Sequence, residues 1–327
     1  MRIAVTGSIA TDHLMVFPGR FADQLIPDQL AHVSLSFLVD GLEVRRGGVA
    51  ANIAFGLGGL GLTPLLVGAV GGDFAEYEVW LKEHGVDTGA VRVSAERQTA
   101  RFMCITDEDA NQIAAFYAGA MQEARDIDLA ALTAPGADRP DLVLVSPNDP
   151  AAMLRHTAQC RELGLPFAAD PSQQLARLDG AEVRELVTGA RWLFTNEYEA
   201  ALLLERTGWD REQVLGVVGS WVTTLGEAGV RIDRRGHDPV VVPAVPDAAV
   251  ADPTGVGDAF RAGFLAGVAR GLAVEPAARL GCVLAAETLG VVGSQAYEVD
   301  PGRLSAAAAR AYGADAAELL APVLGDR

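Results

Sequence analysis

The chain has 327 residues, of which 50% are hydrophobic and 21% charged, and its formal net charge is −17 at pH 7. This composition is globular and argues against a disordered protein, and the length allows one large α/β domain with a smaller appendage. The strong negative charge argues against a nucleic acid polymer or an anionic membrane surface as a partner.

The start of the chain and the cysteines indicate the cellular compartment of the protein. Residues 1–7 predict a short buried strand and not a secretory signal, because they lack a long apolar core. Cys104, Cys160 and Cys282 have no paired spacing, which favours a reducing compartment over a disulfide framework or a zinc site. We therefore expect a cytoplasmic protein.

Residues 49–72 carry no formal charge and are long enough to span a membrane. Their glycines and Pro64 predict instead a buried helix over Val49–Gly59, a turn, and a buried strand over Leu65–Val70. No membrane partner is expected.

Helical and short apolar segments alternate after Val70, which predicts parallel βαβ units. The predicted helices are 74–84, 151–163 and 197–206, and the predicted strands are 141–146, 166–169, 192–195 and 221–225. An antiparallel tail is predicted over 230–233 and 240–245, and helices from Gly257 onward.

Two segments among the first 120 residues interrupt this alternation and predict hairpins of a second, smaller sheet. In the first, a strand over 32–39 places Val33, Leu35, Phe37 and Val39 on one face, and Asp40-Gly41 is a typical two-residue turn before a strand over 42–46.

In the second hairpin, strands over 99–106 and 112–118 flank the turn 107–111. Symmetry about Asp109 places Phe102 directly opposite Phe116 on one face. Such a pair suits the grip of a flat ring, although packing of the sheet explains it equally well.

The small sheet is predicted to be inserted into the large domain. The large domain is expected to comprise residues 1–10, 48–97 and 119–327, and the β lid residues 11–47 and 98–118.

The most informative motif is Asp252-Pro253-Thr254-Gly255-Val256-Gly257-Asp258-Ala259-Phe260, a glycine-containing turn that leads into a helix. Glycines allow a tight turn whose N–H groups, together with the helix dipole, form an anion hole for phosphate. An aspartate at this place can accept a proton, so Asp258 and residues 255–257 would supply a base and a phosphate site.

This motif closely resembles the C-terminal signature of the ribokinase-like (PfkB) family of sugar and nucleoside kinases. Arg46-Gly47-Gly48-Val49-Ala50-Ala51-Asn52 resembles the N-terminal signature of the family, in the right order and spacing. The resemblance spans nearly the whole sequence. It implies an α/β fold with a mostly parallel central sheet flanked by helices and a small β lid. It also implies that Asp258 is the base and that Gly255, Val256 and Gly257 form the anion hole.

The same resemblance assigns Asp12, Gly48 and Asn52 to the acceptor. Asp12 and Asn52 would bind sugar hydroxyls, and the missing Cβ of Gly48 would leave room for substrate. Taken alone, Asp12 is equally well a loop cap, and Asn52 a satisfied polar group in a helix.

Two further elements of the family predict where ATP and Mg²⁺ bind. Asn196 and Glu199 match its Asn-x-x-Glu element near Mg²⁺, where they would order the hydration shell of the ion, although the pair also fits a helix capping box. Thr224, Gly226 and Gly229 resemble the ATP-binding loop. Arg261, one turn beyond Asp258, is either a phosphate contact or a solvated charge, and we leave it out of the predicted catalytic residues.

The acceptor is predicted from the lid. Ser8, Asp12, Ser36, Phe102, Phe116 and Gln173 resemble those of bacterial adenosine kinases of this family, in which the phenylalanines sandwich the purine. A free sugar offers no planar face for such a pair. Adenosine, phosphorylated on its 5′-hydroxyl to AMP in purine salvage, is therefore the first expectation. A ribokinase or fructokinase activity is the alternative, and a catalytically dead nucleoside-binding protein is a less favoured one.

The resemblance implies direct transfer from ATP with Mg²⁺, and it leaves open whether a monovalent cation activates the enzyme. The lid is expected to close over the acceptor. Its exposed strands also predict a homodimer formed through the lid.

Overall fold

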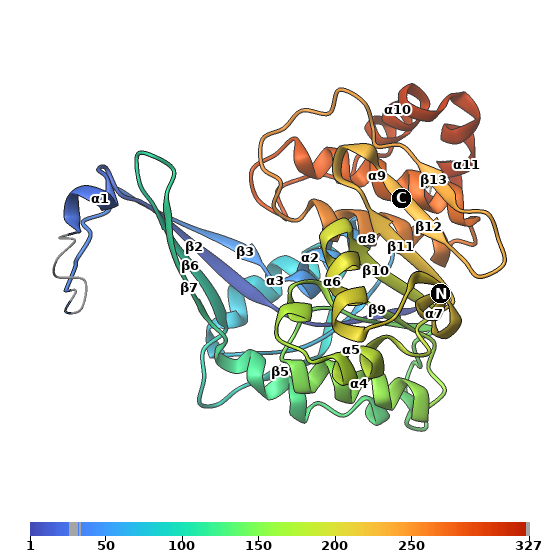
Figure 1. Cartoon of the computed structure of the whole chain (residues 1–327), viewed down its shortest axis with the longest axis horizontal. Coiled ribbons are helices and arrows are strands. Elements are labelled where there is room, and N and C mark those ends of the chain that lie inside the picture. Colours follow the sequence, from blue (N-terminus) through green and yellow to red (C-terminus); the bar gives the residue numbers. More distant parts are fainter. Residues whose placement is uncertain (26–31, 33, 325–327) are drawn as a thin grey trace.

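The computed structural model describes residues 1–25, 32 and 34–324. Its strands form two sheets (Figure 1), a large one in the order β13-β12-β11-β10-β9-β8-β1-β4-β5 and a small one in the order β3-β2-β6-β7. The strands are β1 (Ile3–Thr6), β2 (Ala10–Val16), β3 (Gly41–Gly47), β4 (Leu65–Val70), β5 (Asp87–Val93), β6 (Ala100–Thr106), β7 (Gln112–Tyr117), β8 (Leu142–Val145), β9 (Phe167–Ala169), β10 (Trp192–Asn196), β11 (Ser220–Thr224), β12 (Val230–Asp233) and β13 (Val240–Val242).

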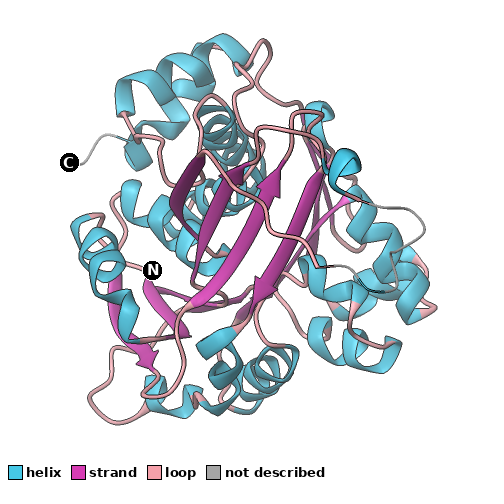
Figure 2. Ribbon diagram, turned by 90° about the vertical axis from the view of Figure 1, so that its left-hand side faces the viewer, coloured by secondary structure: helices cyan, strands magenta, loops and turns pink. Residues whose placement is uncertain are grey.

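Helices cover both faces of the large sheet (Figure 2). One face packs against α2, α3 and the C-terminal helices α8 to α11, and the other against α4 to α7, in two separate apolar clusters. The helices are α1 (Phe21–Gln24), α2 (Val49–Gly59), α3 (Ala75–Glu83), α4 (Pro150–Glu162), α5 (Gly180–Val187), α6 (Glu197–Thr207), α7 (Arg211–Val217), α8 (Val256–Ala269), α9 (Val274–Leu289), α10 (Pro301–Tyr312) and α11 (Ala314–Leu324).

The large sheet is parallel from β5 to β11, β12 pairs antiparallel with β11, and β13 pairs antiparallel with β12. From β1 the chain continues to β4 and β5 on one side, and later to β8, β9, β10 and β11 on the other. The order therefore reverses between β1 and β8. In sheets of this kind ligands bind at the carboxyl ends of the strands beside such a reversal.

Most of the predicted elements of the large sheet are confirmed. The helix Val49–Gly59 and the strand Leu65–Val70 have the predicted bounds, and the other predicted strands and helices are displaced by at most a few residues at their ends. Strand β5 was not predicted, because Gly89 and two charged residues interrupt any apolar run in it.

The predicted first hairpin is wrong. Residues 34–39 form no strand, and Val33 lies outside the described residues. The antiparallel partner of β3 is β2, with Asp12 opposite Arg45. The side chain of Phe37 packs instead against Phe17 and Phe21 beside α1, so its apolar character reflects a small cluster at the far end of the lid.

The second hairpin is confirmed, because β6 and β7 pair with Phe102 opposite Phe116. The centre of the small sheet is the parallel pair β2 and β6, in which Asp12 lies beside Phe102. The small sheet extends away from the large one (Figure 1). Its separation as a lid with the boundaries given above stays a prediction.

Candidate active site

The predicted phosphate-binding turn caps the start of α8. Gly255 is the N-cap, with φ at +80°, and a Cβ there would lie 2.5 Å from the Cβ of Ser294. Glycine is therefore required twice, by the left-handed backbone and by the close approach of residue 294. The first turn of a helix leaves N–H groups without helical acceptors, so residues 255–257 offer donors to an anion, although the N–H of Val256 also has a long contact of 3.4 Å with the Pro253 carbonyl oxygen.

Asp258 lies in this first turn, and its Oδ2 accepts a hydrogen bond of 2.9 Å from Nδ2 of Asn52 on α2. Burial raises the pKa of Asp258 from its ordinary value of 3.8 to about 7, against the lowering effect of the Asn52 bond and of the Arg261 charge. Its neighbours Asp170 and Glu199 raise the pKa further. A carboxylate that titrates near neutral pH is suited to take a proton from a hydroxyl.

Arg261, which the sequence left ambiguous, is a buried partner of Asp170. Its Nε lies 2.5 Å from Oδ2 of Asp170 and its Nη2 donates to Oδ1 at 2.8 Å, and the side chains are 7% and 1% exposed. Burial raises the pKa of Asp170, and the guanidinium opposes that rise. The pair joins α8 to the carboxyl end of β9. In the sequence, the one indication of this ion pair was Asp170, an acidic residue directly after a predicted strand.

Ser8 and Gly48 connect the first strand to α2. The Ser8 hydroxyl accepts from the N–H of Val49 at 3.0 Å. Gly48 has φ at +93°, and a Cβ there would lie 2.6 Å from both the Ala10 nitrogen and the Ser8 carbonyl oxygen. Close packing against the backbone of residues 8–10 therefore explains why position 48 is a glycine.

Four residues form one row across the small sheet. The registers place Arg45, Asp12, Phe102 and Phe116 side by side on β3, β2, β6 and β7, with all four side chains on one face. Burial raises the pKa of Asp12, and Arg45 opposes this rise. Arg45 also contacts Asp252 at 3.4 Å, at the start of the loop before α8. This face of the small sheet therefore carries charged side chains on β3 and β2 and aromatic side chains on β6 and β7.

Two predicted substrate residues lie apart from these contacts. Ser36 is exposed, in a segment without strand structure. Gln173 is exposed in the 3₁₀ turn Ser172–Ala176, and its neighbour Gln174 is the buried one, donating to the Asn148 carbonyl oxygen at 2.8 Å. The sequence did not distinguish the two adjacent glutamines because a segment of five residues is too short to show which side faces inward.

Asn196 and Glu199 form a capping box at the start of α6. The Asn196 side chain accepts from the Glu199 nitrogen at 2.8 Å, and the Glu199 carboxylate accepts from the Asn196 nitrogen at 2.7 Å. The other oxygen of Glu199 accepts from Ser172 at 3.2 Å. The carboxylate thus faces the carboxyl ends of β9 and β10, near Asp258.

The predicted ATP loop follows β11. Thr224 ends this strand, and Gly226 has φ at +58° with open space around its Cβ position. Gly229 has φ at +96°, and a Cβ there would overlap the Val242 carbonyl oxygen. Gly229 is therefore required by the tight turn between β11 and β12.

A group of three or more His, Cys, Asp or Glu side chains able to hold a metal ion does not occur within residues 1–25, 32 and 34–324. The carboxylate of Glu199 is of the chemical type that orders the water shell of a magnesium ion held by ATP phosphates. None of the described helices is long and apolar enough to cross a membrane.

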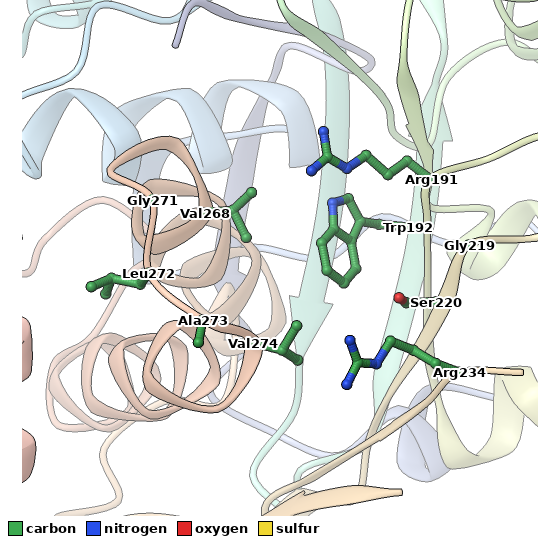
Figure 3. Close-up of a pocket in the computed structure, with 10 residues that line it drawn as sticks. All are labelled: Arg191, Trp192, Gly219, Ser220, Arg234, Val268, Gly271, Leu272, Ala273 and Val274. Atoms are coloured by element: carbon green, nitrogen blue, oxygen red, sulfur yellow. The ribbon is translucent and has the colours of Figure 1, made fainter. Parts of the chain in front are cut away.

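A cavity of about 520 Å³ lies at the opposite, amino ends of β10 and β11, lined by Arg191, Trp192, Ser220 and Arg234 (Figure 3). The predicted site residues are absent from its lining. The chemistry at the carboxyl ends therefore identifies the candidate site, and this cavity does not contribute to it.

Known proteins share much of this sequence and of this fold. Residues 9–300 match the pfkB family of carbohydrate kinases. A nucleoside kinase of Methanothermobacter thermautotrophicus is 32% identical over 281 residues, which cover 84% of this chain and 88% of that protein. The nucleoside kinase of Burkholderia thailandensis in complex with inosine superposes with a TM-score of 0.81 at 34% identity, covering 95% of this chain and 98% of that one. Its complex with ADP-inosine gives a TM-score of 0.80 at 35% identity, covering 95% and 96%.

The chain thus shares its overall fold with these proteins over nearly the whole length. The chain belongs to the pfkB carbohydrate kinase family and has its ribokinase-like fold.

Proposed function

We propose that this protein is a nucleoside kinase that transfers the γ-phosphoryl group of Mg·ATP to the 5′-hydroxyl of a purine nucleoside, with adenosine as the first acceptor. The observation that carries this proposal is the pairing of Asp258 with Asn52 at the start of α8. The names of the relatives support it, since they are nucleoside kinases and one was solved with inosine.

In the proposed reaction the 5′-hydroxyl of the acceptor attacks the γ-phosphorus in line with the leaving oxygen. The new O–P bond forms as the bond between the γ-phosphorus and the β,γ-bridging oxygen breaks. Asp258 takes the hydroxyl proton, and ADP leaves with the bridging oxygen. The N–H groups of Gly255, Val256 and Gly257 offset the charge that develops on the phosphoryl oxygens.

We assign the acceptor to the row on the small sheet. Asp12 accepts hydrogen bonds from ribose hydroxyls, and Asn52 contributes from α2. Phe102 and Phe116 supply the aromatic surface. Directly opposed Cβ atoms on neighbouring strands are about 5 Å apart, which is too close for a base to enter between them. We therefore propose that the two rings form a platform on which the purine lies.

We assign ATP to the ends of β10 and β11, with Asn196, Thr224, Gly226 and Gly229 around it. A bound magnesium ion would neutralise phosphate charge, and Glu199 would order its water. Ser8 supports the turn that carries Gly48, and Gln173 and Ser36 require lid closure to approach the acceptor. Monovalent-cation activation and a cytoplasmic location stay predictions.

Inosine is the second candidate acceptor, because the relative from Burkholderia thailandensis was solved with it. Adenosine and inosine share the ribose and a flat purine, and they differ at the purine 6-position. The proposed platform contacts ring faces and does not distinguish them. A sugar kinase and a catalytically dead binding protein are the further alternatives.

The test is an assay of ATP-dependent phosphorylation with adenosine, inosine, guanosine, cytidine, ribose and fructose. We expect transfer to purine nucleosides, and a loss of about 10²- to 10⁴-fold in kcat for Asp258→Asn. Asp238→Asn, the same change at an exposed position, is the matched control. Transfer to sugars alone would overturn the acceptor assignment, and full activity of Asp258→Asn would overturn the assignment of the base.

A further inference from the structure

A continuous set of buried polar side chains lies behind Asp258 and connects it to Trp80 on α3. The indole Nε1 of Trp80 donates to Oε1 of Gln295 at 3.1 Å, and Nε2 of Gln295 donates to Oδ1 of Asn52 at 2.9 Å. Nδ2 of Asn52 then donates to Oδ2 of Asp258. Asn52 and Gln295 are each only 6% exposed, so water cannot substitute for these partners.

The orientation of each amide follows from chemistry. An indole N–H can only donate, so the Gln295 atom facing it must be the carbonyl oxygen. The NH₂ group of Gln295 is then directed to Asn52 and to the Tyr77 hydroxyl, which itself donates to the Gly47 carbonyl oxygen at 2.9 Å. The Asn52 oxygen must meet this NH₂ group, which leaves its own NH₂ group for Asp258.

We infer that Gln295, oriented by the Trp80 indole, is a positioning residue that fixes the side-chain amide of Asn52 so that its NH₂ group faces Asp258. This inference rests on the proposed role of Asp258 as base. Ser294 also donates to the Asn52 oxygen, at 3.0 Å, but its single proton is shared with the Arg46 carbonyl oxygen. Gln295 is therefore the stronger constraint.

Without this constraint Asn52 can rotate by 180° and present its oxygen to Asp258. An oxygen facing a carboxylate disfavours the ionised form and favours a protonated acid that donates to it. The charged groups around Asp258 are Arg261 on its own helix, Asp170 after β9 and Glu199 on α6, and the phenols of Tyr77 and Tyr297 lie nearby. The variants described below leave these groups unchanged, so the groups contribute equally to the titration of Asp258 in every variant.

Two variants test the inference. Gln295→Met removes the amide at similar volume, and Trp80→Phe removes the indole N–H with part of the ring system while keeping an aromatic ring against Phe55. Trp209→Phe is the matched control, because the Trp209 indole lies against Arg184 and takes no part in the hydrogen bonds from Trp80 to Asp258. The measurements are the pH profile of kcat with saturating Mg·ATP and the pH titration of the Asn52 NH₂ signal in ¹⁵N-labelled protein, assigned by its loss in Asn52→Ala.

We expect the acid limb of kcat to move upward by about one to two pH units in Gln295→Met, and by less in Trp80→Phe, with rates returning toward wild type at high pH. The midpoint of the Asn52 titration should move with it. An equal loss of rate at every pH, with an unmoved midpoint, would show a merely structural role and overturn the inference. If Asp258→Asn stays active, the proposed base fails, but the NMR midpoint still decides the role of Gln295.

Discussion

Asp258 has to be ionised to act as a base, and burial opposes that ionisation. Its hydrogen bond from Asn52 and the charge of Arg261 favour the ionised form, and the balance places its pKa at about 7. A weaker set of partners would leave the carboxyl protonated at neutral pH. A fully solvated carboxylate would be ionised but a poor proton acceptor.

The pH dependence of activity follows from this value. The pKa of Asp258 is raised, and the working form is deprotonated, so kcat/KM should fall as the pH falls through about 7, with a limb that reflects one proton. A pH profile of kcat/KM checks this. Asp238→Asn should keep the same limb. A profile that stays flat down to pH 5 would contradict the assignment.

The two phenylalanines of the lid should contribute to binding of the nucleoside and not to binding of ATP. Phe116 on β7 is 53% exposed, which is unfavourable for a large aromatic side chain unless another surface covers it. Replacement of Phe102 or Phe116 by Ala should raise KM for adenosine roughly 5- to 100-fold, the range of one base–aromatic stack, and leave KM for ATP unchanged.

Steady-state kinetics with adenosine and ATP varied in turn decide this prediction. Ile113→Ala, on the same strand but on the opposite face, is the control variant. Unchanged adenosine kinetics in both Phe variants would show that these rings only pack the sheet.

At the scale of elements, α8 is held at its catalytic end by the buried pair of Arg261 and Asp170. Arg261→Met would leave Asp170 buried without a counter-charge, and we expect a loss of about 3–5 kcal/mol of stability. The double variant with Asp170→Asn should recover most of it. Arg279→Met, which breaks an exposed contact with Glu275, should cost less than about 1 kcal/mol.

Thermal and urea unfolding of the three variants measure these differences. A loss for Arg261→Met as small as that for Arg279→Met would show that Asp170 is neutral in the folded protein.

The elements of the large sheet were predictable because their strands are short apolar runs bounded by turn residues. The signatures around Asn52 and Asp258 were predictable because their glycines have specific backbone requirements. The partner of β3 was not, since Ala10–Val16 contains Thr, Asp and His, and its strand structure depends on pairing with β6. The link from Gln295 to Asn52 joins residues 243 positions apart, and no local pattern indicates it.

For the whole molecule, the face of the small sheet opposite Asp12 carries an exposed apolar group that we call the apolar lid face, formed by Leu42, Val44, Ile113 and Tyr117. We expect a homodimer that buries this face. Val44→Glu should weaken dimerisation at least tenfold, measured by sedimentation equilibrium. Val241→Glu, at the exposed edge strand β13, should not. A wild-type monomer at tens of micromolar would contradict the prediction.

The central pair of the small sheet also determines when that sheet can form during synthesis on the ribosome. Ala10 pairs with Ala100, so β2 leaves the exit tunnel 90 residues before its partner β6. During that interval β2 and β3 have only each other, and an isolated pair of strands is marginally stable. The row to which we assign the acceptor needs both Asp12 and Phe102, and it is therefore completed only after α2, β4 and β5 have been made. On this assignment, the nascent chain builds part of its large sheet before it can hold an acceptor.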